Sequence, residues 1–210
     1  MEDTNAKRGR GRPRAFSRED ALDAAMRLFW QKGYAATGIA ELTEAMGIGT
    51  KSLYAAFGSK EGLYEQALEL YITRYEDRVW LRFSLATTAR EAVEAFLTDS
   101  ASFLTNPLGD SDGYGCMVTL ARAGDEGNDY LGTLERTVRG RLLERVRNRL
   151  ADAKGTGELP KNADVNAMAR LILSMQNGMS ILARDGANCD ELERAVKVWM
   201  SGWAEFARGS

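Results

Sequence analysis

The chain of 210 residues contains no histidine. Without imidazole, Ser-His-Asp and Cys-His nucleophilic schemes are unavailable, and the commonest transition-metal ligand is missing. Catalysis by carboxylates, lysine or tyrosine remains open, but the sequence shows no convincing carboxylate pair and no metal-binding pattern. We therefore expect neither an enzyme nor a metal or other cofactor.

Cysteine, proline and long apolar runs are also scarce. The two cysteines, Cys116 and Cys189, lie far apart and form no CxxC motif, which argues against a disulfide scaffold or a zinc site. No apolar run approaches the roughly 18 residues that a membrane span needs, and the polar, basic N-terminus is unlike a secretory signal. We expect a cytoplasmic protein that does not contact the membrane.

Positive charge is unevenly distributed along the chain. The whole chain has a formal net charge of −2, yet residues 7–60 hold ten Lys/Arg against five Asp/Glu. Five of these cations fall within KRGRGRPR at residues 7–14, where glycine and proline fill most other positions. A basic N-terminal part on an acidic body indicates that one end of the protein meets a polyanion.

The three prolines and the short β-branched runs favour helix along the whole chain. We predict an all-α fold of about nine helices, with a flexible basic arm (1–14), a small helical domain (15–60) and a larger helical domain (61–210). Apolar spacing and capping residues place the boundaries. The expected helices cover 17–32, 39–46, 50–56, 60–84, 88–105, 127–153, 164–185 and 189–208, with a short apolar segment at 115–124.

Residues 33–60 carry the clearest functional pattern. Two short helices are separated by a tight turn at Gly47, which is the arrangement of a helix-turn-helix. Neither helix is long enough to be stable alone, so a small shared core must hold both. The second helix of such a unit enters the DNA major groove. The expected core residues are Leu42, Met46, Ile48, Leu53 and Phe57.

Over residues 16–71 the sequence resembles the TetR family of transcriptional regulators. The motifs that carry the resemblance are Leu28-Phe29-Trp30 with Gly33-Tyr34, then Thr37, Ile39 and Leu42, then Gly47-Ile48, Leu53-Tyr54-x-x-Phe57, and Lys60 with Leu63. The resemblance implies an N-terminal three-helix DNA-binding unit and a divergent helical domain that dimerises and binds a small-molecule effector.

The sequence also departs from the family pattern. Gly38 stands where the family usually has a Ser or Thr helix cap, and Ala55 and Ala56 replace an aromatic residue and a histidine that commonly contact phosphate. The arm offers compensation, because Arg10-Gly11-Arg12-Pro13 is similar to an AT-hook core that lies in a narrow minor groove. The alternative is a disordered tail that only raises the local positive charge.

The recognition helix at 50–56 supplies the candidate base contacts. Lys51 can donate to guanine, and Thr50 or Ser52 to a base or a phosphate. Tyr54 is either a phosphate contact or part of the core. By resemblance, Thr37 and Lys60 hold the DNA backbone. The predicted arm contacts are Arg10, Arg12 and Arg14.

The larger domain offers a predicted dimer surface and a predicted pocket. Residues 167–182 are apolar around more of the helix than one buried face requires, and the last helix carries a second apolar stripe, which favours a homodimer over purely intrachain packing. The dimer residues we expect are Ile172, Met175, Gly178, Val196, Trp199, Trp203 and Phe206. The bulky residues that either line an effector pocket or form plain core are Trp80, Phe83, Phe96, Phe103, Tyr114, Met117, Tyr130, Met175 and Met179.

Cys116 is a candidate reactive thiol because it follows a turn-rich loop and precedes a short apolar segment, so a helix N-terminus would favour its thiolate. An inert buried cysteine is the other interpretation.

Together these features predict a homodimeric repressor that binds a pseudo-palindromic operator in double-stranded DNA and is released by a small apolar or aromatic molecule of unknown identity. Two other classes remain open. One is an architectural protein that binds DNA through the arm without sequence preference. The other is a helical small-molecule-binding protein.

Overall fold

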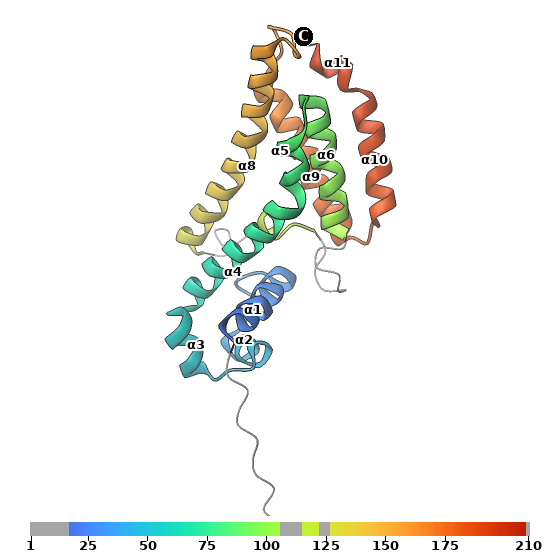
Figure 1. The fold of residues 1–210 in the computed structure, drawn as a ribbon. Helices are drawn as coiled ribbons and strands as arrows, with labels where there is room; N and C mark the ends of the chain where they lie inside the picture. The colour runs from blue at the N-terminus through green and yellow to red at the C-terminus, as the bar shows by residue number, and fades with distance from the viewer. Residues whose placement is uncertain (1–16, 106–114, 122–126, 209–210) are drawn as a thin grey trace, which may run out of the picture.

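The computed structural model describes residues 17–105, 115–121 and 127–208, and no strand occurs within these ranges (Figure 1). With α4 through α5 taken as one continuous helix and α10 with α11 as another, the described residues form nine helices, and the predicted all-α fold is confirmed. The elements are α1 (Arg18–Lys32), α2 (Ile39–Met46), α3 (Thr50–Phe57), α4 (Lys60–Tyr75), a π-helical turn (Glu76–Trp80), α5 (Leu81–Leu85), α6 (Ala89–Thr105), α7 (Met117–Leu120), α8 (Asp129–Thr156), α9 (Val165–Arg184), α10 (Cys189–Ser201) and α11 (Trp203–Ala207).

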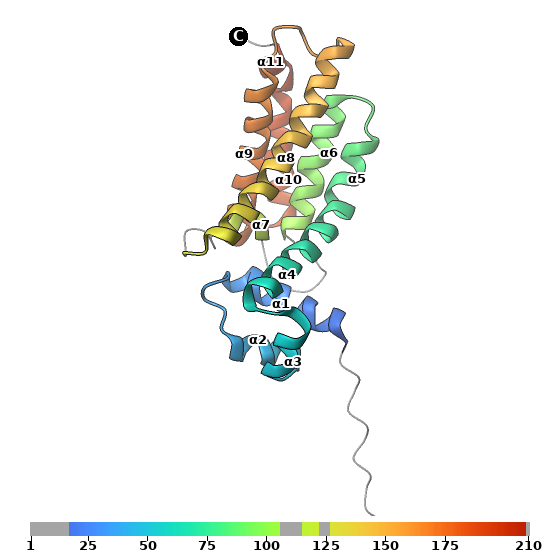
Figure 2. The ribbon, with the colours of Figure 1, turned by 90° about the vertical axis from the view of Figure 1, so that its left-hand side faces the viewer.

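One long helix joins two lobes of unequal size (Figure 1, Figure 2). The small lobe consists of α1, α2 and α3, and α4 runs from it into the bundle of α5–α11. α1 packs against α2 and α4, while α6 packs against both α9 and α10. The expected domain boundary at residue 60 coincides with the start of α4, but α4 contributes to both lobes.

Local sequence signals set the ends of the helices in the small lobe. The hydroxyl of Ser17 accepts a hydrogen bond from the amide of Asp20 at 3.2 Å, and the hydroxyl of Ser59 accepts one from the amide of Gly62 at 3.0 Å. Each serine satisfies an amide that would otherwise lack a partner in the first turn. The observed bounds of α1, α2 and α3 lie within one residue of the predicted ones.

The predicted helix at 60–84 differs from the structure because a π-helical turn interrupts it at Glu76–Trp80. The buried stripe runs through Tyr71, Tyr75 and Val79 at a spacing of four residues and continues with Trp80 and Phe83. The wider turn shifts the stripe by one residue, so that the Trp80 ring stacks on Phe96 with centroids 4.5 Å apart. The apolar spacing along the sequence carried no signal for this turn.

The predicted helix at 189–208 is likewise interrupted, at Gly202. The amide of Gly202 donates to the carbonyl of Trp199 at 3.1 Å, which ends α10 before α11 begins. Glycine has a low helix propensity, which favours a break at this position. None of the described helices is both long and apolar enough to cross a bilayer.

Candidate nucleic-acid interface

The helix-turn-helix is built around a left-handed glycine. Gly47 has φ 65°, a conformation that a β-carbon disfavours, and its amide donates to the carbonyl of Glu44 at 3.1 Å. The amide of Ile48 donates to Thr43 at 3.0 Å, so the chain turns tightly from α2 into α3. The sequence predicted this turn from Gly47 alone.

A small apolar core holds α3 against the rest of the lobe. Leu42 and Leu53 have no exposed surface, and Phe57 and Met46 are nearly as buried. The guanidinium of Arg18 covers the outer side of the Phe57 ring, 4.8 Å from its centroid. The interpretation of Leu53 and Phe57 as core residues is confirmed.

The opposite side of α3 is open to solvent. Thr50, Lys51, Ser52 and Tyr54 are all exposed. Tyr54 has 45% of its surface exposed, so its ring is not part of the core and its hydroxyl is available to a partner. The four predicted contacts therefore lie together on one helix, whose other side is anchored.

Thr37 is not on the surface, where it was expected to contact the DNA backbone. It has no exposed surface, and its hydroxyl donates to the carbonyl of Gly33 at 2.6 Å. Its amide donates to Tyr34 at 3.3 Å. The threonine closes the turn between α1 and α2, so its side chain is not available for a direct phosphate contact.

Lys60 lies at the first turn of α4 and is held against an aromatic ring. Its ammonium is 4.2 Å from the centroid of Tyr34, whose hydroxyl donates to Glu61 at 2.8 Å. Burial, and then the bond to the Glu61 carboxylate, raises the pKa of Tyr34 to about 12, so the phenol stays protonated at neutral pH. The surface of Lys60 is half-buried, and it remains a candidate phosphate contact.

Gly38 leaves α2 without a side-chain cap at its start. The carboxylate of Glu41 compensates in part, because it accepts a hydrogen bond from the amide of Gly38 at 3.4 Å. Lys32 forms an ion pair with Glu41, and this contact, followed by the Gly38 amide, lowers the pKa of Glu41. The expected weak start of α2 is thus tied to the end of α1.

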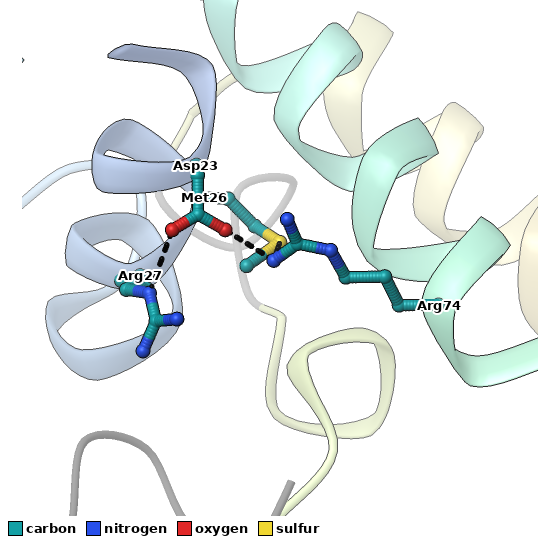
Figure 3. Close-up of polar contacts among 4 residues, drawn as sticks. All are labelled: Asp23, Met26, Arg27 and Arg74. Carbon is teal, nitrogen blue, oxygen red and sulfur yellow. Dashed lines mark hydrogen bonds and ion pairs between the residues drawn. The ribbon is translucent and has the colours of Figure 1, made fainter. Parts of the chain in front are cut away.

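An ion-pair network fixes α1 to α4 (Figure 3). The carboxylate of Asp23 accepts from Arg27 at 2.9 Å and from Arg74, whose guanidinium also lies 4.0 Å from the sulfur of Met26. Burial acts to raise the pKa of Asp23, but the hydrogen bonds and charges of Arg27 and Arg74 outweigh it and lower this pKa. The small lobe is therefore joined to α4 by polar contacts as well as by packing.

Comparisons with known proteins agree with this geometry. Residues 21–67 match the family described as bacterial regulatory proteins, tetR family. Over 207 residues, 96% of each chain, the sequence is 34% identical to the HTH-type transcriptional repressor ComR of Escherichia coli (strain K12). The chain belongs to the TetR family.

Two further similarities concern the DNA-binding unit and the whole fold. Over 62 residues, 30% of this chain and 32% of the relative, the sequence is 53% identical to the HTH-type transcriptional repressor BdcR of Escherichia coli (strain K12). A cysteine mutant of the TetR family transcriptional regulator CifR, complexed with 26bp double-strand operator DNA, superposes with a TM-score of 0.83 at 33% identity. That match covers 92% of this chain and all of the other. These relatives are regulators of transcription and not enzymes.

Several predicted pocket residues of this TetR-family chain pack against one another. The Trp80 ring contacts Phe83 at 5.0 Å and Phe96 at 4.5 Å between centroids, and the guanidinium of Arg145 covers it at 4.4 Å. Phe103 contacts Tyr75 at 5.1 Å. These rings are buried and pack on one another, so they form core in this conformation.

The other predicted pocket residues are dispersed. Met117 and Met179 are buried, whereas Met175 is half-buried. Tyr130 is 58% exposed and its hydroxyl donates to Glu65 at 3.0 Å on the surface, so its assignment to a pocket was wrong. Tyr114 lies outside the described residues.

A buried polar cluster escaped the sequence prediction. Tyr75 lies 3.5 Å from the hydroxyl of Ser100 and accepts from Gln176 at 3.4 Å, all between side-chain atoms. The hydroxyl of Tyr71 is buried beside Cys116 and Met117. Burial, foremost, raises the pKa of both tyrosines. The available signal was Gln176, which follows Ile172 by four residues and precedes Met179 by three, on the buried side of α9.

Cys116 is not placed as a reactive thiol would be. It has 1% of its surface exposed, and the helix that follows it, α7, has only four residues. Its amide donates to the hydroxyl of Ser180 on α9 at 2.7 Å, which joins the start of α7 to that helix. The structure thus favours the interpretation of Cys116 as a buried structural residue.

Only some of the residues predicted for the dimer surface are accessible to a partner. Ile172 on α9, Val196 on α10 and Trp203 on α11 are buried within the chain, so their assignment to a partner contact was wrong. Both α9 and α10 pack against α6. Met175, Gly178 and Trp199 are half-buried, and the Phe206 side chain lies outside the described part of the structure. The exposed apolar residues on these two helices are Leu171, Ile181, Leu182 and Val198.

Proposed function

We propose that this protein is a homodimeric transcriptional repressor that binds an inverted-repeat operator through α3 and is released from it by a small molecule. The observation that carries the proposal is the division of α3 into two sides. Leu53 and Phe57 fix the helix from one side, while Lys51, Ser52 and Tyr54 project from the other. A helix presented in this way fits the major groove.

The exposed side chains suggest separate roles at the DNA. Lys51 donates to guanine, and Thr50 and Ser52 donate to bases or phosphates near the start of α3. Tyr54 and Lys60 hold the phosphate backbone, which fixes the register without reading sequence. Thr37 acts indirectly, because its bond to Gly33 shapes the turn that leads into α2.

The arm supplies the electrostatic attraction that the folded lobe lacks. Within residues 17–60, five Lys/Arg are balanced by five Asp/Glu, so the surplus of positive charge belongs to residues 7–14. We place Arg10, Arg12 and Arg14, which lie outside the described residues, along the minor groove beside each half-site. Arginines in a narrow groove meet a concentrated negative potential.

The exposed apolar residues of α9 and α10 support a homodimer. Leu171, Gly178 and Leu182 are spaced seven and four residues apart, so they lie along one stripe of α9. Val198 on α10 is 74% exposed. An isologous interface between these helices and their copies would remove this apolar surface from water.

The effector is proposed to be a small apolar or aromatic molecule. The core of the larger lobe is rich in rings, and Tyr71, Tyr75 and Phe103 pack against one another between α4 and α6. A flat apolar ligand would displace some of these contacts and shift α4. Because both copies of α3 must reach fixed half-sites, a small change in their separation weakens operator binding.

The decisive experiment is selection of bound duplexes from a random pool with the purified full chain at near-physiological salt. We expect enrichment of one inverted repeat with a single half-site spacing. Enrichment of A·T-rich DNA without symmetry would instead favour an architectural protein that binds through the arm. Failure to enrich any duplex, in the absence of effectors, would contradict the proposal.

A further inference from the structure

The last residue of α9 contacts the last turn of α1. The guanidinium of Arg184 donates to the carbonyl of Trp30 at 3.1 Å and to the carbonyl of Gln31 at 3.4 Å. These contacts join residues that are more than 150 positions apart in the sequence. They connect the small lobe directly to α9, without passing through α4.

The chemistry of this contact favours a specific restraint. The last carbonyls of a helix have no partner within the helix and carry the negative end of its dipole. A guanidinium presents several donors in a fixed planar fork, so it can hold two successive carbonyls at once. Arg184 therefore fixes the end of α1 in position and direction.

The surroundings of Arg184 show that packing alone does not fix this joint. A cavity of about 120 Å³ lies between the two lobes. Its walls come from Trp30–Tyr34 at the end of α1, from Met117 and Leu120 on α7, and from Arg184. A space of this size has room for several waters, so side chains do not fill the joint, and the polar contact carries more of the restraint.

The position of Arg184 in the chain connects two features of the proposed function. Leu182, two residues before it, belongs to the exposed apolar stripe of α9. Gln31, which it contacts, lies just before the segment 33–38 that leads into α2 and α3. A change in the angle between α9 and α1 would therefore alter the distance from the dimer axis to the recognition helix.

We propose that Arg184 is a positioning residue for DNA binding, which sets the separation of the two recognition helices by holding the carbonyl end of α1 against the end of α9. This inference rests on the proposed function, because it requires a dimer formed through α9. α4 and the packing of the Trp30 ring on Phe103 of α6, with centroids 6.2 Å apart, already connect the two lobes. Arg184 adds the polar contact that joins α9, the proposed dimer helix, directly to the small lobe, and this contact restrains rotation about the other connections.

The test compares the wild-type chain with Arg184→Ala, Arg184→Lys and the control Arg141→Ala, which removes an exposed arginine of α8. Each is titrated with the selected inverted repeat and with two derivatives that have one base pair added or removed between the half-sites. We expect Arg184→Ala to bind the selected duplex about five- to tenfold more weakly, the loss of one or two charged hydrogen bonds. Its preference over the two derivatives should fall by a similar factor.

The other variants complete the expected pattern. Arg184→Lys keeps the charge but not the fork, so it should be intermediate, and Arg141→Ala should match the wild type. Equal weakening on all three duplexes would show a general loss of stability and overturn the inference, as would wild-type behaviour of Arg184→Ala. Poor folding of Arg184→Ala would leave Arg184→Lys to decide by the same comparison.

A second measurement requires no DNA. Ala55→Cys on the exposed side of α3, combined with Cys189→Ser, gives one accessible thiol per chain, because Cys116 is buried. Spin labels at this position report the distance between the two recognition helices in the dimer. Arg184→Ala should broaden this distribution, and an unchanged distribution would overturn the inference. A wild-type chain that is monomeric or binds no duplex would instead contradict the proposed function.

Discussion

The carboxylate of Asp23 on α1 accepts hydrogen bonds from Arg74 on α4, which lies 51 positions later in the chain, and from Arg27 one turn further along its own helix. About a quarter of the Asp23 side chain remains exposed. The network thus lies at the edge of the contact between α1 and α4, where water screens it in part.

This ion pair should make the stability of the protein depend on pH in the acid range. The pKa of Asp23 is lower in the folded chain, so its contribution is present above the usual aspartate value of about 3.9 and is lost as the pH falls through the lower folded value. We expect Asp23→Asn to reduce the free energy of unfolding by about 1 kcal/mol or less at pH 7. The difference from wild type should shrink below about pH 4.

Urea unfolding at several pH values measures this difference. Asp152→Asn, which changes an exposed carboxylate of α8, is the matched control and should show no such trend. A difference between Asp23→Asn and wild type that stays constant down to pH 3 would contradict the assignment.

Substitutions of Leu53 and Lys51, which lie on the same helix, should affect different properties: folding for Leu53 and DNA recognition for Lys51. Leu53 has no exposed surface, so Leu53→Ala should cost about 2–5 kcal/mol of stability by leaving a cavity in the small lobe. Lys51 is exposed, so Lys51→Ala should change stability by less than about 0.5 kcal/mol. Its effect should appear at the DNA, as about 1–3 kcal/mol of lost discrimination at one base pair in each half-site.

Thermal unfolding and a repeated duplex selection measure these two effects. The assignment of Lys51 as a base contact would fail if Lys51→Ala weakened binding to all sequences equally, since that is the behaviour of a phosphate contact.

The small lobe was the part of the molecule that the sequence predicted best. Its helices are bounded by Ser17, Gly47 and Ser59, whose effects on the backbone act within one turn. The apolar spacing of Leu53 and Phe57 then identified the buried side of α3. Local signals of this kind depend little on the rest of the chain, so they can be interpreted from sequence alone.

Tertiary contacts determine which of several similar side chains are buried, and the sequence alone did not predict this. Leu171 and Ile172 are adjacent and similarly apolar, yet Ile172 is fully buried and Leu171 is 44% exposed. Polar residues such as Asn166, Arg170 and Asn177 mark one exposed side of α9, but apolar residues cover the rest, so periodicity did not separate the side that packs within the chain from the side that Leu171 exposes. Thr37 shows the same limit: its hydroxyl suits a phosphate or a carbonyl, and the nearby Gly33 carbonyl decides the outcome.

The proposed dimer surface can be tested with one introduced charge. Leu182 is 50% exposed on the apolar stripe of α9, so Leu182→Glu should leave the monomer folded. A carboxylate buried without a partner between two copies should weaken dimerisation by about 100-fold, equivalent to roughly 3 kcal/mol. Operator binding should weaken with it.

Sedimentation at micromolar concentration measures the change in dimer content. Leu85→Glu on α5 is the matched control, because Leu85 is 73% exposed and α5 packs mainly against α6 and the π-helical turn. The surface would be wrongly placed if both variants dimerised like the wild type.

The N-terminal arm should dominate the salt dependence of DNA binding. Because charges within residues 17–60 balance, removal of residues 2–14 takes away five Lys/Arg together with two Asp/Glu, a net positive charge of three per chain. Each phosphate contact contributes about 0.9 to the slope of log affinity against log salt, so the slope should fall by up to about 4 per chain.

Arg10→Lys with Arg12→Lys keeps the charge and separates groove recognition from simple attraction. We expect this variant to keep the slope but lose preference for A·T pairs beside the half-sites, because lysine is a point charge that lacks the planar fork of arginine. Titrations at three salt concentrations, on duplexes with A·T or G·C flanks, measure both effects. An arm whose deletion changes neither affinity nor slope plays no part in binding.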